Sequence, residues 1–351
     1  MTYLAKPKIH HPHLPRNARG LTRRDYEGAL STLCAGCGHD SVSAAIIQAC
    51  FELNLPAHRL AKLSGIGCSS KTPTYFLGKS HGFNAVHGRM PAIASGANLA
   101  NRDLIYIGVS GDGDTASIGL GQFAHVVRRR LNMLYIVDNN GTYGLTKGQF
   151  SATNDYGAKS KKGAVNLHEP IDLVLLALQL GASFVARSFS GDKQQLVPLI
   201  KAGLMHPGFA FIDVISPCVA FNNHEGSMKS YQYLRDHDAP VVAADYVPHH
   251  EEMVADYGPG GGEAIPMPDG SLVRLRKLAE DYDPRDRIAA MEHIQRHQER
   301  GEVVTGLLYL DPEPVDLHAL LDTIEQPLNS LSERELCPGQ AALDKINQGL
   351  R

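Results

Sequence analysis

The chain has 351 residues, 43% of them hydrophobic, which is longer than one average domain and ample for a buried core. Its net charge of −3 gives no general reason to expect binding to nucleic acid or a membrane, and no segment is apolar and long enough to span a bilayer. The first residues lack the apolar region of a signal peptide, so we expect a cytoplasmic protein whose six cysteines serve metal binding or catalysis before disulfides.

Residues 1–30 form a basic N-terminal arm, in which six lysines and arginines precede the first acid, Asp25. Prolines interrupt this stretch and disfavour regular structure. We expect an extended arm lying on a neighbouring subunit, or a disordered terminus.

A Cys-x-x-Cys pair, Cys34 and Cys37, comes next and opens an amphipathic helix that reaches Cys50. Such a pair alone fits zinc, dithiol redox chemistry or an iron–sulfur cluster. A predicted strand, Arg59–Leu63, then leads into the glycine-flanked sequence Gly65-Ile66-Gly67-Cys68-Ser69-Ser70-Lys71. A third cysteine at the end of a strand is placed to meet the first pair.

Residues 104–141 predict a βαβ unit. Leu104–Val109 is an apolar strand that stops at Ser110-Gly111-Asp112-Gly113-Asp114, where glycines let the backbone approach a charged ligand. Helical spacing begins at Ile118, and a second strand, Met133–Val137, ends in Asp138-Asn139-Asn140-Gly141. Both turns follow the carboxyl ends of strands, where open α/β sheets bind ligands.

These two turns offer oxygen atoms of the kind that Mg²⁺ prefers. The carboxylate of Asp112, the amide oxygen of Asn140 and the backbone carbonyl of Thr142 can take three places in an octahedral shell that a diphosphate completes. Backbone amides exposed by the glycines would bind the diphosphate. The stretch lacks the Gly-Lys-Ser/Thr of a Walker A loop and the order of a Rossmann fingerprint.

Helices and strands alternate as far as residue 215: helix Ile171–Leu180, strand Ser183–Ala186, helix Lys193–Met205 and strand Phe209–Ile215. The alternation predicts a doubly wound, largely parallel α/β sheet in a domain over residues 31–223.

Cys218 directly follows the last of these strands, so thiolates from Cys34, Cys37, Cys68 and Cys218 can converge on a [4Fe–4S] cluster or a structural Zn²⁺. Their chemistry alone does not separate these two groups. We leave out Cys50, on the apolar face of its helix, and Cys337, in a polar tail.

The composition changes after Asn223, and we expect residues 224–351 to be an appended C-terminal extension that packs on a partner. Residues 224–270, with the run Gly258–Gly262, predict a long loop. A hairpin or strand and a helix are predicted within Leu272–Ile294, a strand over Val303–Tyr309, and one helix in the tail from Pro312.

Gly111-Asp112-Gly113 and, 25 residues later, Asn139-Asn140 resemble the thiamine-diphosphate (ThDP) motif of ThDP-dependent enzymes. Together with the four cysteines, the chain resembles the β subunits of 2-oxoacid:ferredoxin oxidoreductases over roughly residues 25–310, in particular the KorB-like 2-oxoglutarate subunits. The resemblance implies the PP-type ThDP-binding fold with Mg²⁺. It favours a [4Fe–4S] cluster over zinc, because an electron carrier suits a carbanion-generating cofactor.

The resemblance also implies residue roles. The loop Tyr143–Gln149 matches the family's loop beneath the thiazolium ring, and His87 and Arg89 fit the pocket or have a capping and ion-pairing role. Implied cofactor contacts are Gly67, Ser69, His87, Gly111, Asp112, Gly113, Asp114, Asn140, Thr142, Gly144, Leu145 and Thr146.

Lys71 and Lys147 occupy positions that reach substrate carboxylates in related enzymes. Two lysines favour the dicarboxylate 2-oxoglutarate over pyruvate, although both could be ordinary surface lysines. The basic loop 157–165 is expected to be mobile and to border CoA or the partner chain, and His39 to donate to a cluster sulfide or to the diphosphate.

The implied reaction is oxidative decarboxylation of 2-oxoglutarate with CoA to succinyl-CoA and CO₂, with electrons passing through the cluster to ferredoxin. Pyruvate or another 2-oxoacid is the alternative substrate; a non-redox ThDP decarboxylase and a zinc-stabilised scaffold are the alternative functions. In the family the α subunit supplies the glutamate that activates ThDP. We therefore expect an active site between α and β, an α2β2 hetero-oligomer and an inactive isolated chain.

Overall fold

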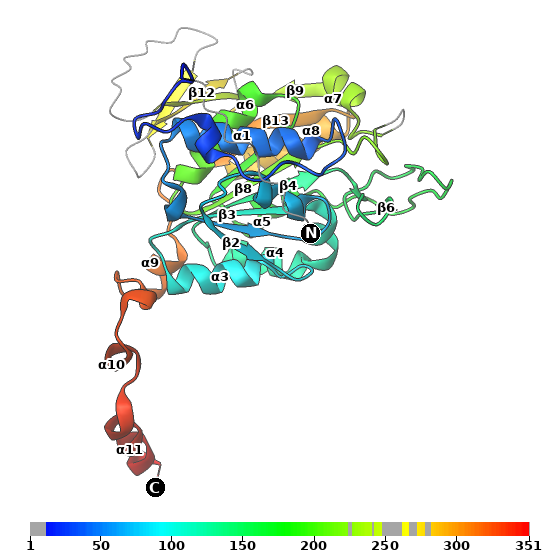
Figure 1. Cartoon of the computed structure of the whole chain (residues 1–351). Coiled ribbons are helices and arrows are strands. Elements are labelled where there is room, and N and C mark those ends of the chain that lie inside the picture. Colours follow the sequence, from blue (N-terminus) through cyan, green and yellow to red (C-terminus); the bar gives the residue numbers. More distant parts are fainter. Residues whose placement is uncertain are drawn as a thin grey trace.

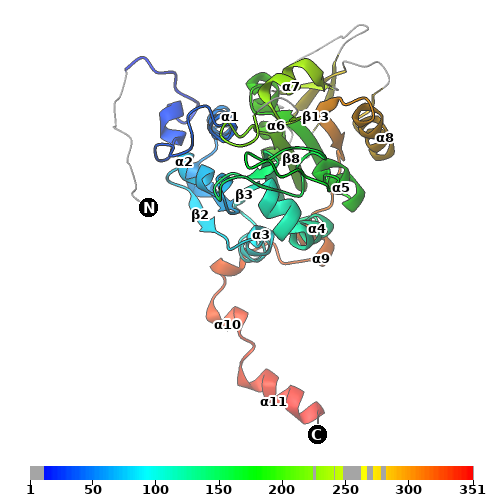
Figure 2. The ribbon, with the colours of Figure 1, turned by 90° about the vertical axis from the view of Figure 1, so that its right-hand side faces the viewer.

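The computed structural model describes residues 12–223, 227–240, 242–247, 262–266, 272–277 and 282–350. Residues 1–11 of the predicted arm and residues 224–226, 241, 248–261 and 267–270 of the predicted long loop lie outside these residues. The prediction of a loop over 224–270 is wrong for its described part, which contains the helix Tyr231–His237 and the strands Asp238–Pro240, Val242–Val247 and Gly262–Pro266. The described chain forms a layered α/β body from which the C-terminal tail projects (Figures 1 and 2). None of its helices is both long and apolar enough to cross a lipid bilayer.

The main sheet, within the described residues, has eight strands in the order β2-β1-β3-β4-β8-β7-β13-β9. Neighbours from β2 to β7 are parallel, β13 is antiparallel to β7, and β9 is parallel to β13. This confirms the predicted doubly wound, largely parallel sheet. The strands are β1 Leu60–Ser64, β2 His81–Asn84, β3 Ile105–Gly111, β4 Met133–Asn139, β7 Phe184–Phe189, β8 Phe209–Ile215, β9 Asp238–Pro240 and β13 Val303–Leu310.

Helices cover both faces of this sheet. On one face α1 packs against α6, and on the other α3, α4, α5 and α8 lie in a row (Figure 2). Aspartates at the N-caps of α5, α6 and α8 accept backbone amide hydrogen bonds and fix where these helices begin. The helices are α1 Gly38–Glu52, α2 Thr72–Tyr75, α3 Met90–Ala100, α4 Leu120–Arg128, α5 Leu173–Leu180, α6 Lys193–Met205, α7 Tyr231–His237 and α8 Arg287–Gln298, with 3₁₀ turns at Arg23–Tyr26, Ala57–Arg59 and Ser69–Lys71.

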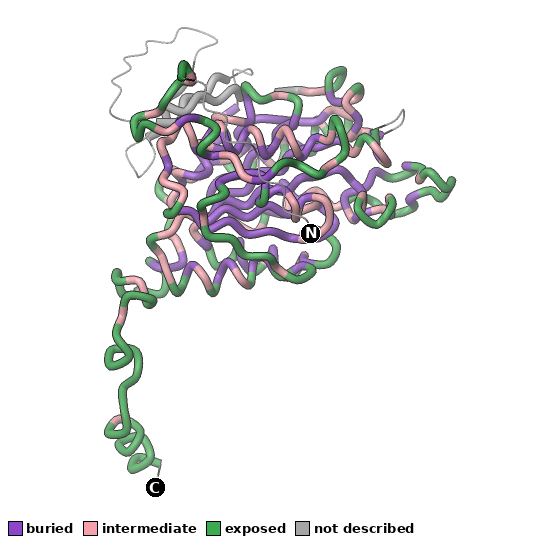
Figure 3. Tube along the Cα trace, viewed as in Figure 1, coloured by how far each residue is buried: buried purple, intermediate pink, exposed green. Residues whose placement is uncertain are grey.

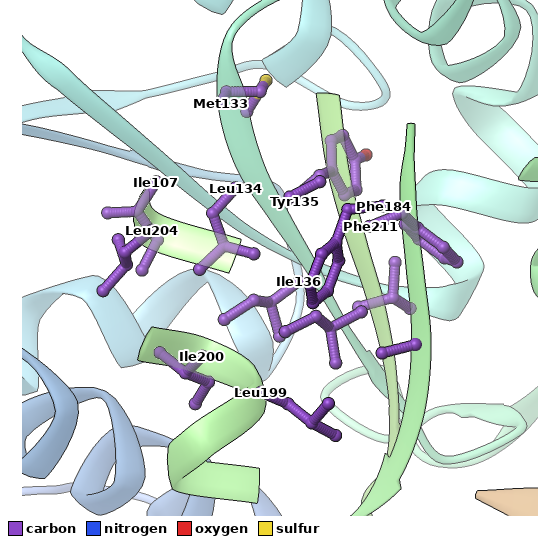
Figure 4. Packing of buried hydrophobic residues seen from close by; sticks show 14 of the residues in the cluster. Ile107, Met133, Leu134, Tyr135, Ile136, Phe184, Leu199, Ile200, Leu204 and Phe211 are labelled. Carbon is purple, nitrogen blue, oxygen red and sulfur yellow. The ribbon is translucent and has the colours of Figure 1, made fainter. Parts of the chain in front are cut away.

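The core lies along the central strands, which are buried over their whole length (Figures 3 and 4). Because helices cover both faces, these strands are apolar on both sides and do not alternate. Phe123 of α4 packs edge-on against Tyr135 of β4 and Phe211 of β8, with ring centroids 5.4 and 5.1 Å away. Burying each such ring stabilises the fold by roughly 1.5–3 kcal/mol.

Four neighbouring strands, β1, β3, β4 and β8, end at one edge of the sheet. Their register fixes this, since Ser64 pairs with Val109, Gly111 with Asp138, and Asn139 with Ile215. The loops that follow carry every cysteine and metal-binding residue predicted after residue 60.

The strand predicted over Ser183–Ala186 continues to Phe189. The predicted start of the helix after β3 is also wrong. We expected the helix after β3 to begin at Ile118, but the backbone already winds as a π-helix over Gly113–Ile118 before α4. The amide of Gly119 donates to the carbonyl of Asp114 at 2.8 Å, which closes this wide turn. Such turns often occur at functional sites.

The prediction of one helix in the tail is also wrong. The tail contains α9 Leu317–Leu321, the 3₁₀ turn Leu328–Ser330, α10 Glu333–Leu336 and α11 Gly339–Gly349. Prolines separate these segments, and Ser332 with Glu335 forms a capping box that starts α10 afresh. Most of the tail after residue 322 is exposed (Figure 3).

The C-terminal part of the chain also extends the body. Strands β9 and β13 join the main sheet, and β10 Val242–Val247, β11 Gly262–Pro266 and β12 Leu272–Lys277 form a separate antiparallel sheet. The boundary after residue 223 stays a prediction, and it separates strands that share one sheet.

Candidate cofactor and cluster site

A cleft opens where β1, β3, β4 and β8 end. Its lining combines both predicted turns with the loop of the third cysteine: His39, Ile66, Gly67, Cys68, Ser69, Gly111, Asp112, Gly113, Asp114, Asp138, Asn140, Thr142, Tyr143 and Gly144. The folding of the sheet thus brings together most of the residues that were implied as cofactor contacts.

Asp112 is buried in this cleft and is held by two hydroxyl groups. Ser151 and Thr153 both donate to its Oδ2, Thr153 at 2.8 Å, while Oδ1 has only a long contact of 3.4 Å with the amide of Asn140. Burial raises the pKa of Asp112, and these hydrogen bonds oppose that rise. One carboxylate oxygen is therefore fixed by protein, and the other remains for a cation.

The other two predicted metal ligands lie in the adjoining loop, which includes the hairpin of β5 Thr142–Tyr143 and β6 Gln149–Phe150. The Oδ1 atom of Asn140 accepts the amide of Thr142 at 3.0 Å. The carbonyl of Asn140 accepts the side-chain amide of Asn222 at 2.7 Å, which holds the turn from behind. The carbonyl of Thr142 accepts the amide of Gly144 at 3.1 Å, and both residues line the cleft together with Asp112.

Two glycines of the first turn leave no space for a side chain. A Cβ on Gly113 would lie 2.4 Å from the ring of Tyr143, whose hydroxyl donates to the Gly113 carbonyl at 3.0 Å. A Cβ on Gly111 would lie 3.0 Å from Ser69 Oγ. The neighbouring Asp114 binds the amide of Gly88 at 2.6 Å and Ser110 Oγ at 2.9 Å, so both of its oxygens already have protein partners.

Asp138, at the end of β4, is fully buried, and neither of its carboxylate oxygens has a hydrogen-bond partner in the described part of the chain. Burial raises its pKa, and the nearby Asp112 raises it further. A buried carboxyl without donors is costly unless a cation lies nearby. A cation bound at Asp112 and Asn140 would meet this need, so the residues present fit Mg²⁺.

His39 connects this cleft to the cysteines. Its Nδ1 lies 2.6 Å from Ser216 Oγ, and its Nε2 lies 3.4 Å from the side-chain nitrogen of Asn140. Burial lowers the pKa of His39 to about 4, so the ring is neutral near pH 7. The expected hydrogen bond to a sulfide or diphosphate stays a prediction.

The four predicted thiols come together beside this cleft. Cys37 interacts electrostatically with Cys68 and Cys218, and Cys68 also with Cys34. Backbone contacts join their loops: the Cys37 amide donates to the Cys34 carbonyl at 3.0 Å, and the Gly38 amide to that of Pro217 at 3.5 Å. No three Cys, His, Asp or Glu side chains in the described chain already surround a single-ion site.

These thiols can act as metal ligands only as thiolates, and a buried thiolate needs a cation to stabilise it. Burial, with smaller contributions from Asp138 and two of the other thiols, raises the pKa of Cys37 to about 12. Burial, and then Cys218, raise the pKa of Cys68, which Lys71 partly opposes. Thiolates gathered here would be stable only with positively charged iron or zinc. The cysteine predicted to be a buried small hydrophobe, Cys50, is indeed fully buried.

A second cavity adjoins the cleft and contains the remaining predicted contacts, His87, Leu145 and Thr146, together with Gly67. Lys71 and Lys147 are next to two residues that line it, Ser70 and Thr146. Lys71 is half-buried, whereas Lys147 is exposed in the β5–β6 hairpin with a positive φ of 80°. The basic loop 157–165 is closed by backbone hydrogen bonds between Gly157 and Asn166 and between Ser160 and Ala164.

Sequence reasoning missed Asp138 and the two hydroxyl donors, Ser151 and Thr153. The available signal was the sequence Ser151-Ala152-Thr153 just after the hairpin, which brings two hydroxyl groups into one turn closed by the Asn154 amide on the Ser151 carbonyl at 3.1 Å.

Comparison with known proteins agrees with this geometry. Residues 65–214 match the family described as "Thiamine pyrophosphate enzyme, C-terminal TPP binding domain". The β subunit of 2-oxoacid:ferredoxin oxidoreductase from a Sulfolobus species is 33% identical over 314 residues, which cover 86% of this chain and 96% of that protein. The chain belongs to the β subunits of the 2-oxoacid:ferredoxin oxidoreductases. The predicted family is confirmed.

Two further relatives of this β subunit carry 2-oxoglutarate in their names. The 2-oxoglutarate oxidoreductase subunit KorB of Mycobacterium tuberculosis is 39% identical over 217 residues, 60% of this chain and 57% of that protein. A solved structure of 2-oxoglutarate:ferredoxin oxidoreductase from Magnetococcus marinus, with 2-oxoglutarate, coenzyme A and succinyl-CoA bound, is 30% identical. It covers 90% of this chain and 94% of its own, with a TM-score of 0.71. A β subunit implies an assembly with an α subunit.

Proposed function

We propose that this β subunit binds thiamine diphosphate and Mg²⁺ at the turns after β3 and β4 and a [4Fe–4S] cluster at its four converging cysteines. With its α subunit, it would decarboxylate 2-oxoglutarate oxidatively with CoA to succinyl-CoA and CO₂ and pass the electrons to ferredoxin. Bound ThDP supplies the nucleophilic carbon and stabilises carbanion character, while the protein orients the reactants.

The observation that carries this proposal is the position of Gly144. A Cβ there would lie 3.4 Å from Cys218 Sγ and 3.6 Å from Cys68 Sγ, yet Gly144 is only two residues after Thr142, a candidate metal ligand. The cysteine site and the metal turn therefore share one backbone segment. A cluster in contact with the cofactor site is what one-electron oxidation of a ThDP-bound substrate requires.

At the diphosphate end, three oxygen donors would hold Mg²⁺: one carboxylate oxygen of Asp112, the side-chain oxygen of Asn140 and the carbonyl of Thr142. The glycines Gly111 and Gly113 keep the backbone free of side chains where the phosphates approach. Asp138 and the neutral His39 lie between this end and the thiols. They exclude water there, because both are almost completely buried.

At the substrate end, Lys71 and Lys147 would bind the two carboxylates of 2-oxoglutarate. Their sequence neighbours Ser70 and Thr146 line the second cavity, and Lys71 lies three residues after Cys68. The names of the M. tuberculosis and Magnetococcus relatives support this substrate over pyruvate.

The α subunit would cover the mouth of the second cavity. Two apolar side chains at this cavity are exposed: Leu145, which lines it, is 53% exposed, and Val86, between the lining residues Ala85 and His87, is 68% exposed. A partner surface on these residues would remove them from water and complete the active site.

The test is an anaerobic assay of the co-expressed α and β subunits with 2-oxoglutarate or pyruvate, CoA and ferredoxin, with acyl-CoA identified by mass. We expect two electrons to reach ferredoxin for each succinyl-CoA formed. Acetyl-CoA as the better product would change the substrate to pyruvate. Release of an aldehyde without ferredoxin reduction would favour the non-redox decarboxylase with a zinc site.

A further inference from the structure

The cysteine site has an inner and an outer side. Cys37, Cys68 and Cys218 are half-buried, and two of them interact with the buried Asp138. Cys34 is exposed, as are Ala35 and Gly36 next to it. The site therefore reaches solvent at the loop Cys34–Gly36.

A cation is anchored beside this loop through an aromatic residue. The hydroxyl of Tyr231 donates to the carbonyl of Gly36 at 3.2 Å. The guanidinium of Arg235, one turn further along α7, lies 5.9 Å from the centroid of the Tyr231 ring and is exposed. This cation–π contact holds a positive charge at the outer edge of the cysteine site.

The loop of the fourth cysteine carries a second anchored cation. The ammonium of Lys161 lies 5.0 Å from the centroid of the Phe221 ring. The amide of Phe221 donates to the carbonyl of Cys218 at 3.2 Å, so this ring is tied to a predicted cluster ligand. A lysine from the otherwise separate loop 157–165 is thereby brought to the same site.

We propose that an acidic electron-carrier protein docks on the surface formed by Cys34–Gly36, Val219, Phe221, Tyr231, Lys161 and Arg235, here called the exit face. This rests on the proposed function, because it requires the cluster. One electron would pass from the reduced cluster to the oxidised iron–sulfur carrier, with no bond made or broken. Lys161 and Arg235 are the charged residues of this surface, and its other residues are uncharged. Val219, which lies next to Gly36, is 37% exposed and adds an apolar contact.

Charge complementarity selects this partner. Two cations at an exposed redox site attract an acidic carrier and orient its approach, and they matter less as salt increases. CoA is also an anion, but the exit face surrounds cluster ligands and not the cavity of the predicted substrate lysines.

The experiment measures binding of a purified acidic ferredoxin to the anaerobic α–β complex by calorimetry, at low and high salt. We expect Kd to rise on the order of tenfold in the double variant Lys161→Glu/Arg235→Glu at low salt. We also expect its salt dependence to flatten. Arg129→Glu is the control, because this exposed arginine follows α4 at the opposite edge of the sheet and should leave Kd unchanged.

Two further readouts keep the outcomes distinct. Iron content and reduction of the small neutral acceptor menadione by 2-oxoglutarate and CoA should stay at the wild-type level in the double variant. An unchanged Kd in the double variant would overturn the proposal that the carrier docks on the exit face. A higher KM for CoA in this variant, or loss of the α subunit from it, would also overturn the proposal. Lys161→Glu alone leaves the Tyr231–Gly36 bond intact and should still weaken binding. Absence of iron and of menadione reduction in the wild type would refute the proposed function itself.

Discussion

The hydroxyl of Thr153 lies 2.8 Å from Oδ2 of Asp112 and 2.9 Å from Oδ1 of Asn139. Thr153 therefore joins the two halves of the ThDP motif from behind, and with Ser151 it turns one carboxylate oxygen away from the cleft. This contact makes Thr153 a positioning residue for the metal, because the orientation of a ligating carboxylate depends on its own hydrogen bonds.

We predict that Thr153→Val weakens Mg²⁺ binding by about 10- to 100-fold, as is usual when such supporting contacts are lost. Retention of ThDP during gel filtration, followed as a function of Mg²⁺ concentration, measures this. Thr153→Ser keeps the hydroxyl and should restore wild-type affinity. If ThDP retention depends on Mg²⁺ concentration equally in Thr153→Val and in the wild type, the contact of Thr153 with Asp112 does not support the metal.

Asp112→Ala should abolish Mg²⁺-dependent retention of ThDP while the iron content stays at the wild-type level. The reason is that Asp112 is the one carboxylate in the proposed Mg²⁺ set and lies on a different strand end from each cysteine loop. Normal retention of ThDP in this variant would remove Asp112 from the metal site.

Cys68→Ala should lose most of the cluster iron and keep at least part of its ThDP binding. Cys68 is the thiol that interacts with both Cys34 and Cys218, so its removal takes away the ligand that lies near both of them. Cys337→Ala is the matched control, since Cys337 is exposed in the tail and should not affect iron. The iron content of both variants is measured by mass spectrometry. A full iron content in Cys68→Ala would exclude Cys68 as a cluster ligand.

Exchange of Lys147 for Leu should raise KM for 2-oxoglutarate about tenfold, roughly the contribution of one charge-assisted hydrogen bond, and change KM for pyruvate much less. The difference arises because only 2-oxoglutarate has a second carboxylate. Steady-state kinetics of the α–β complex with both acids provide the measurement. A similar rise for both would mean that Lys147 does not recognise the second carboxylate.

A prediction about stability concerns Arg187, which is buried between Asp172 at 2.8 Å and Asp213 at 3.0 Å. Arg187→Met leaves two carboxylates without their cation and should destabilise the fold by about 3–5 kcal/mol at pH 7. Urea unfolding followed by circular dichroism measures the difference. A loss below about 1 kcal/mol would contradict a structural role for this cluster.

The pH dependence of that difference has a definite sign. Burial would raise the pKa of Asp172, but its ion pair with Arg187 and its hydrogen bonds outweigh burial and lower it below the ordinary 3.8. A carboxyl with a lowered pKa stabilises the fold above its unfolded pKa and loses this contribution as the pH falls through the folded value. The gap between wild type and Arg187→Met should therefore be constant above about pH 5 and narrow below about pH 4.

The sheet and the metal turns could be predicted because they depend on local patterns. The helix Lys193–Met205 and the strand Phe209–Ile215 were predicted with the observed bounds. The helix has apolar residues at helical spacing, and the strand is a nearly continuous apolar run with clear ends. The three predicted Mg²⁺ oxygens follow two strands that pair directly, so sequence order alone placed them together.

The residues that were missed depend on contacts between distant segments. Thr153 supports Asp112 only because the β5–β6 hairpin returns the chain beneath the first turn. Asp138 is notable for having no partner, which no sequence pattern shows. The π-helix at Gly113–Ile118 has no periodic signature, and it forms where Asp114 is tied to Ser110 and Gly88.

The central claim is that the four thiols bind a redox cluster beside the ThDP site. Iron, zinc and acid-labile sulfide analysis of the protein purified without oxygen, together with its visible spectrum, tests it most directly. We expect about four iron and four sulfide per chain with broad absorbance near 400 nm, as is usual for such a cluster. One zinc and no sulfide in repeated anaerobic preparations would contradict it and leave a ThDP enzyme with structural cysteines.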